Sequence, residues 1–310
     1  MKRASKVLVA AALDPTTGTV YTGEALTGVA TVDPSSAFVA SEVKVKPTVE
    51  MVDRKIINNS FSTPAGVPGK KYIEATITVE LAGSGTAATP PAWANLFEAC
   101  GCEKEATSDY VSYRLGNSEK TATIYFWLDG SLIKLVSGMG SAKINLTAGD
   151  IGKVEFTFKG LYVTPEDVTQ PTNTPTSPLP PIVKSAGLSI GGYSPVAQSV
   201  SLDFGNDVKL RENINAPDGY SFAYIADRSP NGSIDPDAFS RGAHDVWAKL
   251  ESGSTESLEL TVGETAGNKV KISCPAIQYT GVEFGDRDGL LTMPLNFKCT
   301  GSPEIEIIFY

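Results

Sequence analysis

The sequence predicts a mainly β protein built as two tandem β-sandwich or half-barrel domains, each with one short flanking α-helix. Three observations support this fold class. Apolar and polar residues alternate over many short runs, each half contains one helical stripe, and a proline-rich stretch divides the chain. With 310 residues and a hydrophobic content of 41%, each half is long enough to bury its own core.

The first strands are expected at 7–13 and 70–81. The apolar run at 7–13 is at the lower limit of a signal-peptide core and ends at Asp14, so a strand is the preferred interpretation. In "KKYIEATITVEL" (70–81) every second residue is apolar, which indicates a strand with one buried face. No apolar run approaches the roughly 18 residues of a membrane-spanning helix, so no membrane partner is expected.

Two hairpins follow. The run from 121 to 136 predicts strands at 121–128 and 132–136 around the turn signal Asp129-Gly130. A further pair of strands is expected at 142–147 and 153–159, joined through a turn rich in glycine.

The stretch "PAWANLFEACG" (91–101) is the exception to this β pattern. Trp93, Leu96, Phe97 and Cys100 recur at i, i+3, i+4 and i+7, which forms one apolar helical stripe. Proline suits the first turn at position 91, and glycine suits the left-handed residue after the end at Gly101. We expect a short helix whose apolar face packs on a sheet.

Six prolines between 165 and 181 predict an extended connector, because proline disfavours both helix and sheet. The chain is therefore expected to comprise a first domain at 1–164, a Pro/Thr-rich linker at 165–187 and a second domain at 188–310.

The second half has the same order of parts as the first. A strand is expected at 221–228, then a helix from Asp235, its cap, through Pro236 in its first turn to Gly253. Strands follow at 256–262 and 268–274, and 286–301 resembles 149–160 in having a glycine-bearing turn, an alternating strand and Phe-Lys. We interpret this order as an internal duplication; the alternative is two unrelated sandwiches of similar build.

No pattern in the sequence predicts catalysis, a cofactor or a metal. The four cysteines lack metal-ligand spacing and are expected to be reduced and packed as small hydrophobes. His244 is the only histidine and is expected to be solvated or to cap a helix. "DRDG" (286–289) is interpreted as a hairpin turn, because position 297 is Phe where a calcium loop needs Glu. We therefore expect a protein that is not an enzyme.

The loop at 58–71 is too long for a tight turn, and long loops in compact domains are often functional. Its residues Ser60, Phe61, Pro64 and Val67 are the candidate contacts with a neighbouring subunit. The alternative is a surface loop without a role.

Six short motifs follow one another between residues 37 and 163: Gly83-Ser84-Gly85, Pro91 to Gly101, Ile124 to Trp127, Asp129-Gly130, Gly138-Met139-Gly140 and Phe158 to Gly160. No single motif is specific, but their order over this span is characteristic. By this order, residues 37–163 resemble the tail tube proteins of long-tailed bacteriophages. Most members of the family have one domain, whereas a second domain that looks like a duplicated tube domain follows here.

The resemblance implies a virion protein of β-sandwich subunits that self-assemble into stacked rings, forming the hollow phage tail tube through which DNA passes into the host. Its partners would be copies of itself, other tail proteins at the tube ends, and DNA only as non-specific cargo. Assembly in the bacterial host cytoplasm is implied. A net charge of −9 is compatible with this passage, because binding to phosphates needs an excess of Lys and Arg.

If the duplication holds, three chains form a ring with pseudo-sixfold symmetry. The alternative is a hexameric ring of first domains with the second domain outside. The alternative function is a phage or bacterial surface-binding protein, an adhesin or receptor-binding sandwich pair, for which exposed loop-tip aromatics would serve: Tyr110, Tyr113, Tyr193 and Tyr220.

Overall fold

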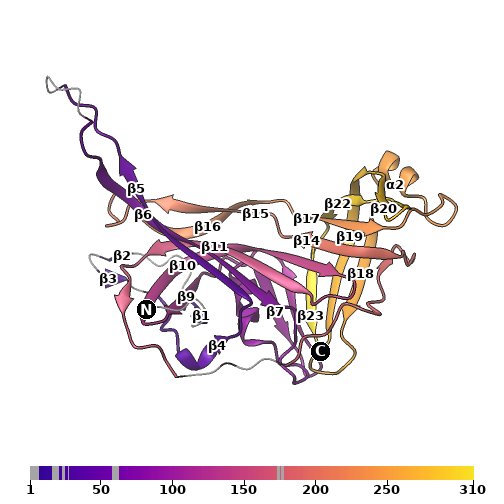
Figure 1. The fold of residues 1–310 in the computed structure, drawn as a ribbon, viewed down its shortest axis with the longest axis horizontal. Helices are drawn as coiled ribbons and strands as arrows, with labels where there is room; N and C mark the ends of the chain where they lie inside the picture. Colours follow the sequence, from indigo (N-terminus) through magenta and orange to yellow (C-terminus); the bar gives the residue numbers. More distant parts are fainter. Residues whose placement is uncertain are drawn as a thin grey trace.

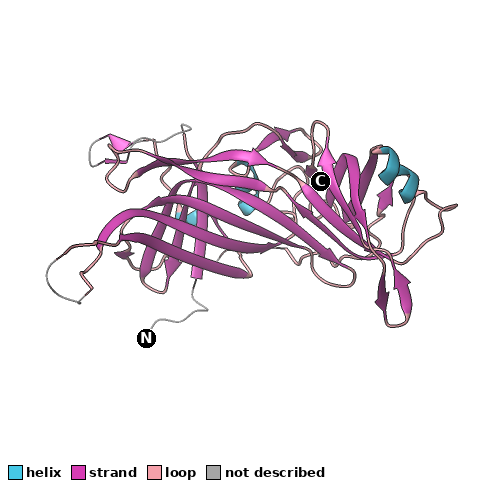
Figure 2. Ribbon diagram, turned by 90° about the horizontal axis from the view of Figure 1, so that it is seen from above, coloured by secondary structure: helices cyan, strands magenta, loops and turns pink. Residues whose placement is uncertain are grey.

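The computed structural model describes residues 7–15, 21–22, 25–26, 28–57, 63–172, 175 and 178–310. The described chain is mainly β with short helices, which confirms the predicted fold class. Figure 1 shows a body of long strands from which one hairpin projects, and Figure 2 shows the same strands from above.

The described part of the first half contains three short helical segments, η1, η2 and α1, among its strands. Its elements are β1 (Val7–Leu13), β2 (Tyr21–Thr22), β3 (Ala25–Leu26), η1 (Pro34–Ser36), β4 (Ala37–Phe38), β5 (Glu42–Val52), β6 (Val67–Glu80), η2 (Ala92–Ala94), α1 (Asn95–Glu98), β7 (Cys102–Ala106), β8 (Val111–Leu115), β9 (Ala122–Leu128), β10 (Ser131–Thr147), β11 (Lys153–Tyr162) and β12 (Glu166–Asp167). The expected strands at 132–136 and 142–147 are one strand, β10, because a bulge between Val136 and Met139 lets the chain bend without ending.

The second half contains the other α-helix. Its elements are β13 (Ser189–Ile190), β14 (Ala197–Asp203), β15 (Asn206–Glu212), β16 (Tyr220–Arg228), β17 (Asn231–Pro236), α2 (Val246–Ser252), β18 (Glu256–Val262), β19 (Val270–Val282), β20 (Gly285–Arg287), β21 (Leu290–Thr292), β22 (Leu295–Thr300) and β23 (Glu306–Phe309). The strand predictions at 221–228 and 256–262 are confirmed. The turn expected at 286–289 is also present, between β20 and β21.

The predicted start of the second helix is wrong. Pro236 ends strand β17, where it lies opposite Ala197 of β14. The helix instead begins after Asp245, whose carboxylate accepts a hydrogen bond from the Ala248 N–H at 2.9 Å. Its predicted end is right, because Gly253 has the left-handed conformation with φ 68°.

Eight strands form one continuous antiparallel sheet that crosses from the first half to the second. Their order is β5–β6–β11–β10–β14–β17–β22–β19. The two halves join where β10 pairs with β14, with Lys143 opposite Asp203 and Thr147 opposite Ser199. We call this pairing the in-chain joint.

A second layer packs on the apolar face of this sheet. In the first half it consists of β4, β1, β9 and the N-terminal part of β10. In the second half it consists of β13, β18, the N-terminal part of β19, β23, β8 and β7. Because β8 comes from the first half and pairs with the C-terminal strand β23, the halves are interlocked in this layer as well.

The two halves have the same strand order. In the first half the sheet is β5–β6–β11–β10, with η2 and α1 between β6 and β10 in the sequence. In the second it is β14–β17–β22–β19, with α2 between β17 and β19. Corresponding pairs also match: Val43 opposite Ile77 has its counterpart in Val200 opposite Ile234, a difference of 157 in residue number on both strands.

The helix predicted at 91–101 packs at the contact between the halves. Trp93, Leu96, Phe97 and Cys100 are all buried, as the stripe predicts. The ring of Phe97 stacks on Phe204 at the end of β14, with centroids 5.9 Å apart. The ring of Trp93 meets Phe309 of β23 edge to face, also at 5.9 Å. The helix therefore fills a core that both halves share.

Candidate functional site

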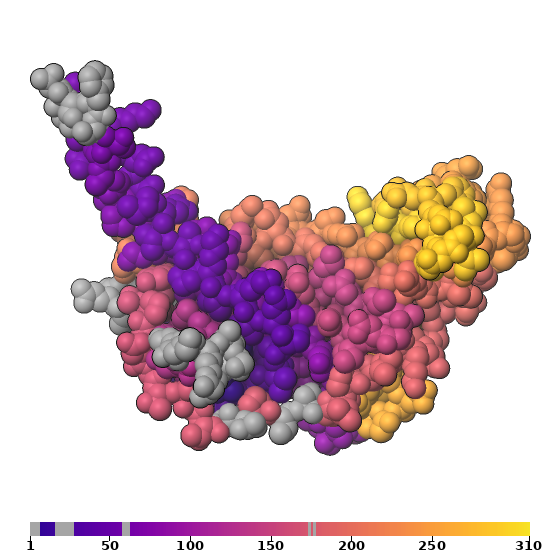
Figure 3. Space-filling view, in the orientation of Figure 1, coloured from indigo at the N-terminus to yellow at the C-terminus, as the bar shows by residue number. Residues whose placement is uncertain are grey.

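The hairpin of β5 and β6 projects from the body as an arm, seen at the upper left of Figures 1 and 3. Of the candidate contact residues, Ser60 and Phe61 lie outside the described residues. Pro64 is half-buried, and Val67 is exposed and opens β6, so residues 67–71 of the expected loop at 58–71 belong to a strand. The arm exposes a set of apolar side chains: Val49, Met51, Val52, Ile56, Ile57 and Val67.

The eight-stranded sheet has two open edges within the described part of the chain. Strand β5 pairs with β6 on one side only. At the other end, the segment from Glu283 to Arg287 continues β19 into β20 and pairs only toward β21 and β22. Figure 1 shows β5 on the left of the molecule and β20 at its right end. Open edges present unpaired backbone N–H and C=O groups, which favour pairing with another chain.

One face of the eight-stranded sheet is apolar and the other is polar. On β11, for example, Val154, Phe156 and Phe158 are buried, while Lys153 and Thr157 are exposed. The hairpin of β15 and β16 packs over one end of the polar face, against Met139 and Leu161. Elsewhere this face interleaves lysines with carboxylates and hydroxyls: Glu42, Lys44, Lys46, Thr76, Lys143, Glu155, Ser201, Asp235 and Asn296.

Loops from the two halves also contact each other, where the loop after β6 meets the loop between β18 and β19. The N–H of Gly83 donates to the side-chain oxygen of Asn268 at 2.8 Å, and the N–H of Gly85 donates to the Gly267 carbonyl at 2.9 Å. The Asn268 amide also donates to the Leu179 carbonyl of the linker at 2.7 Å. The predicted Gly83-Ser84-Gly85 turn is thus held against the second half.

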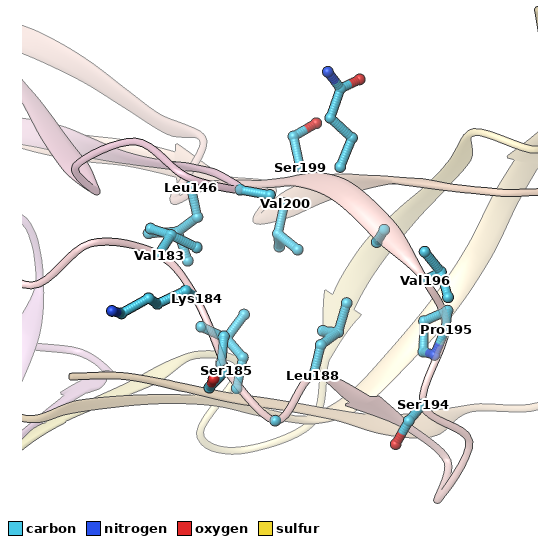
Figure 4. A pocket seen from close by; sticks show the side chains of 16 residues that line it. Leu146, Val183, Lys184, Ser185, Leu188, Ser194, Pro195, Val196, Ser199 and Val200 are labelled. Carbon is cyan, nitrogen blue, oxygen red and sulfur yellow. The ribbon is translucent and has the colours of Figure 1, made fainter. Parts of the chain in front are cut away.

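A pocket of about 370 Å³ lies where the linker returns to the sheet. Figure 4 shows Leu146 and Val200 pointing into it from the in-chain joint, with Val183 and Leu188 of the connecting segment facing them. Its lining carries a single charged side chain, that of Lys184. The remaining lining is made of apolar side chains with a few serines and Gln198.

His244 is buried, which corrects the expectation of a solvated or capping histidine. Its Nε2 lies 3.0 Å from Oε1 of Glu256, and its ring stacks on Tyr193 with centroids 5.2 Å apart. Tyr279 and Lys249 also hydrogen-bond to Glu256. Burial raises the pKa of Glu256, but the bonds from Lys249, Tyr279 and His244 outweigh burial and hold its pKa below the ordinary value. The cluster anchors α2 to β18 and β19.

The four cysteines are free thiols and buried, as expected for small core residues. Burial raises the pKa of Cys100 and Cys102, so both remain protonated at neutral pH. Among the described residues, no group of three or more His, Cys, Asp and Glu side chains is placed to hold a metal ion. None of the helices in the described part of the chain is long and apolar enough to cross a membrane.

The chain that carries the open edges, the projecting arm and the matching halves was compared with known protein families. The family model described as "Phage tail tube protein" matches residues 5–299. The chain belongs to the phage tail tube protein family. The match includes both halves, so the resemblance found at 37–163 extends through nearly the whole tail tube protein. A comparison with curated proteins found no match.

The aromatic residues expected for a surface-binding protein are not displayed on loop tips. Tyr113 and Tyr220 are buried, and Tyr110 and Tyr193 are half-buried. The two open edges were not predicted from the sequence. The segments "EVKVK" at 42–46 and "SVSLD" at 199–203 have the same alternation and occupy the same position in their halves, although only the first is an edge.

Proposed function

We propose that this tail tube protein self-assembles into rings that stack into a hollow tube, and that DNA passes through the tube into the host. The observation that carries the proposal is the eight-stranded sheet with one open edge at each end. Copies joined edge to edge would extend this sheet into a closed ring. Closure would satisfy the backbone groups that otherwise promote aggregation.

We further propose that each chain supplies two equivalent tube domains, residues 1–164 and 188–310, connected by the linker at 165–187. Three chains then complete a ring with pseudo-sixfold symmetry. The identical strand order of the halves supports this arrangement, since the in-chain joint already places one half beside the other. In a hexamer of first domains alone, β5 of a neighbouring copy would have to pair with β10. Strand β14 of the same chain already pairs there, so the two strands would compete for β10.

In this ring the polar face of the sheet lines the channel, because the apolar face is covered by the second layer. Lysines and carboxylates alternate on it, so it carries no excess of positive charge with which to hold phosphates. The net charge of −9 alone would suggest an acidic lining. A lining of mixed charge differs from that, but it too would let DNA pass without being bound. DNA is then cargo that passes without specific contacts.

The arm of β5 and β6 is proposed to dock on the next ring of the stack, with Ser60, Phe61, Pro64 and Val67 as the candidate contact residues. Its exposed apolar residues support this role, since a cluster of apolar side chains on a monomer marks an interaction site. Other tail proteins would bind the rings at the two ends of the tube. The location proposed is the virion tail, after assembly in the host cytoplasm.

Negative-stain electron microscopy of the purified chain at rising concentration tests the proposal. The expected result is stacked rings or uniform hollow tubes above a critical concentration. Particles of one small size at every concentration would overturn it and would instead support a surface-binding protein.

A further inference from the structure

The edge that one chain offers to the next is fixed by the correspondence between the two halves. We propose that residues 42–46 of β5 pair antiparallel with residues 283–287 of a second copy of this chain, in one register set by opposite charges. The inference rests on the proposed ring, and it specifies which residues meet at the joint between chains.

The register follows from matching each strand of the in-chain joint to its counterpart. On one side, β14 corresponds to β5, so Asp203 corresponds to Lys46 and Ser199 to Glu42. On the other side, the pair Asn145–Lys153 of β10 and β11 corresponds to the pair Gly285–Thr292 of β20 and β21.

The counterpart of Lys143 follows from the same alignment. Lys143 lies opposite Glu155 of β11, and the N–H of Glu283 donates to the carbonyl of Pro294 at 3.0 Å in the equivalent place. Substituting counterparts into the in-chain joint gives five facing pairs between chains: Glu283–Lys46, Phe284–Val45, Gly285–Lys44, Asp286–Val43 and Arg287–Glu42.

The charges at this joint are complementary. Glu283 faces Lys46, and among the described residues neither side chain has an ion-pair partner within the chain. Arg287 faces Glu42 at the other end of the segment, although Arg287 also binds Asp235 within its own chain. Opposite charges directly across an antiparallel pair are stabilising, and like charges are destabilising.

These charges also determine which half of one chain can pair with which half of the next chain. The in-chain joint has Lys143 opposite Asp203, so its polarity is the reverse of the Glu283–Lys46 pair. A joint between two first halves would place Lys143 opposite Lys46, and one between two second halves would place Glu283 opposite Asp203. Both are like-charge contacts. The pattern therefore favours strict alternation of halves around the ring, and with it the trimer rather than the hexamer.

The exposure of the side chains agrees with an in-chain joint that is already paired and a joint between chains that is still open. Ile144 and Leu202, which face each other in the in-chain joint, are fully buried. Their counterparts are Phe284, which is 60% exposed, and Val45, which is half-buried. A second copy in the proposed register would cover both side chains.

The side-chain geometry is favourable for contact. In the in-chain joint the Phe204 N–H donates to the Ala142 carbonyl and the Ala148 N–H to the Gln198 carbonyl. Lys143 and Asp203 therefore form a pair without mutual backbone hydrogen bonds, the type in which Cα atoms approach to about 4.5 Å. The corresponding Glu283–Lys46 pair has the same close geometry.

Charge exchange tests the proposal, with tube formation measured by sedimentation and negative-stain microscopy and folding checked by near-UV circular dichroism. Lys46→Glu and Glu283→Lys should each raise the critical concentration for tubes about tenfold, because each places like charges at every joint. The double variant K46E/E283K should return to within about threefold of wild type. The matched control K104E/E264K reverses two exposed charges away from the joint and should behave as wild type.

Cysteine cross-linking tests the register directly. On oxidation, K46C/E283C should give covalent trimers on a non-reducing gel, since Cα atoms at about 4.5 Å suit a disulfide. The off-register control K46C/Q278C should not. Wild-type tubes with neither rescue nor cross-link would overturn the register and leave the proposed function standing. Cross-linking of K46C/K143C would likewise overturn it in favour of the hexamer. A wild-type chain that forms no rings would overturn both proposals.

Discussion

Replacing Phe97 by alanine tests whether the two halves share one core. Phe97 is fully buried in α1, and its ring lies 5.1 Å from Phe156 and 5.5 Å from Tyr113 of the first half. It also stacks at 5.9 Å on Phe204, which belongs to the second half. Loss of this ring therefore removes contacts on both sides of the boundary.

The expected cost is large. A buried Phe→Ala substitution lowers the free energy of unfolding by about 3–5 kcal/mol, and each lost aromatic pair adds roughly 0.5–1.5 kcal/mol to the loss from area alone. Phe97 makes several such pairs, so we expect the upper part of that range. With a shift of about 2–4 °C per kcal/mol for chains of comparable size, the midpoint of thermal unfolding should fall by about 10 °C.

The assay is thermal unfolding followed by circular dichroism below the concentration of assembly, together with hydrogen–deuterium exchange. Amides of β18 and β22 in the second half should lose protection together with those of β6 and β11. The matched control is Phe222→Ala, which removes the same ring from a half-buried position on β16 and should cost less than about 2 kcal/mol.

Two results would refute the reasoning. One is a Phe97→Ala protein within about 1 kcal/mol of wild type. The other is loss of protection confined to the first half, which would mean that the halves unfold independently and that the contact with Phe204 adds little.

Three further predictions follow from other contacts. Glu256→Gln should lower the free energy of unfolding at neutral pH and should make that free energy less dependent on pH. Because the pKa of Glu256 is lowered in the folded chain, its contribution is present above its ordinary value of 4.5 and is lost as pH falls through the folded pKa, which unfolding curves between about pH 3 and 7 would detect. Gly83→Ala should destabilise by at least about 1 kcal/mol in urea unfolding, since a Cβ there would overlap the carbonyl of Gly267, whereas alanine at the open position Gly242 should cost less. In the arm, Val52→Asp with Val67→Asp should leave single rings in solution and abolish stacked tubes in electron micrographs; tubes of normal length would exclude the docking role.

Much of the fold could be predicted because its local signals agree with its long-range pairing. The apolar stripe of 91–101 predicts the helix, and the Asp129-Gly130 turn predicts the hairpin of β9 and β10. The second helix was misplaced because Pro236 is compatible with a first helical turn. Pairing with Ala197 of β14, a residue distant in sequence, keeps it in a strand instead.

The open edges of the sheet could not be predicted for a different physical reason. An edge strand has the same alternation as a central one, and only its pairing partners distinguish the two. Val43 and Val200 belong to the same pattern, yet Val200 is enclosed by two neighbouring strands and Val43 by one. That difference depends on long-range topology, which alternation within one strand does not record.

In the proposed ring the edge at β5 pairs with another copy but has to resist all other strands, and Pro47 is compatible with both requirements. Proline has no backbone N–H, so the pairing ladder cannot continue past it. Its counterpart in the second half is Phe204, whose N–H donates to Ala142 just beyond the last pair of the in-chain joint. The open edge is thus limited to the charged segment 42–46. A short edge whose lysines and glutamate prefer one register is protected against indiscriminate pairing, while it can still pair with a second copy of this chain in the proposed register.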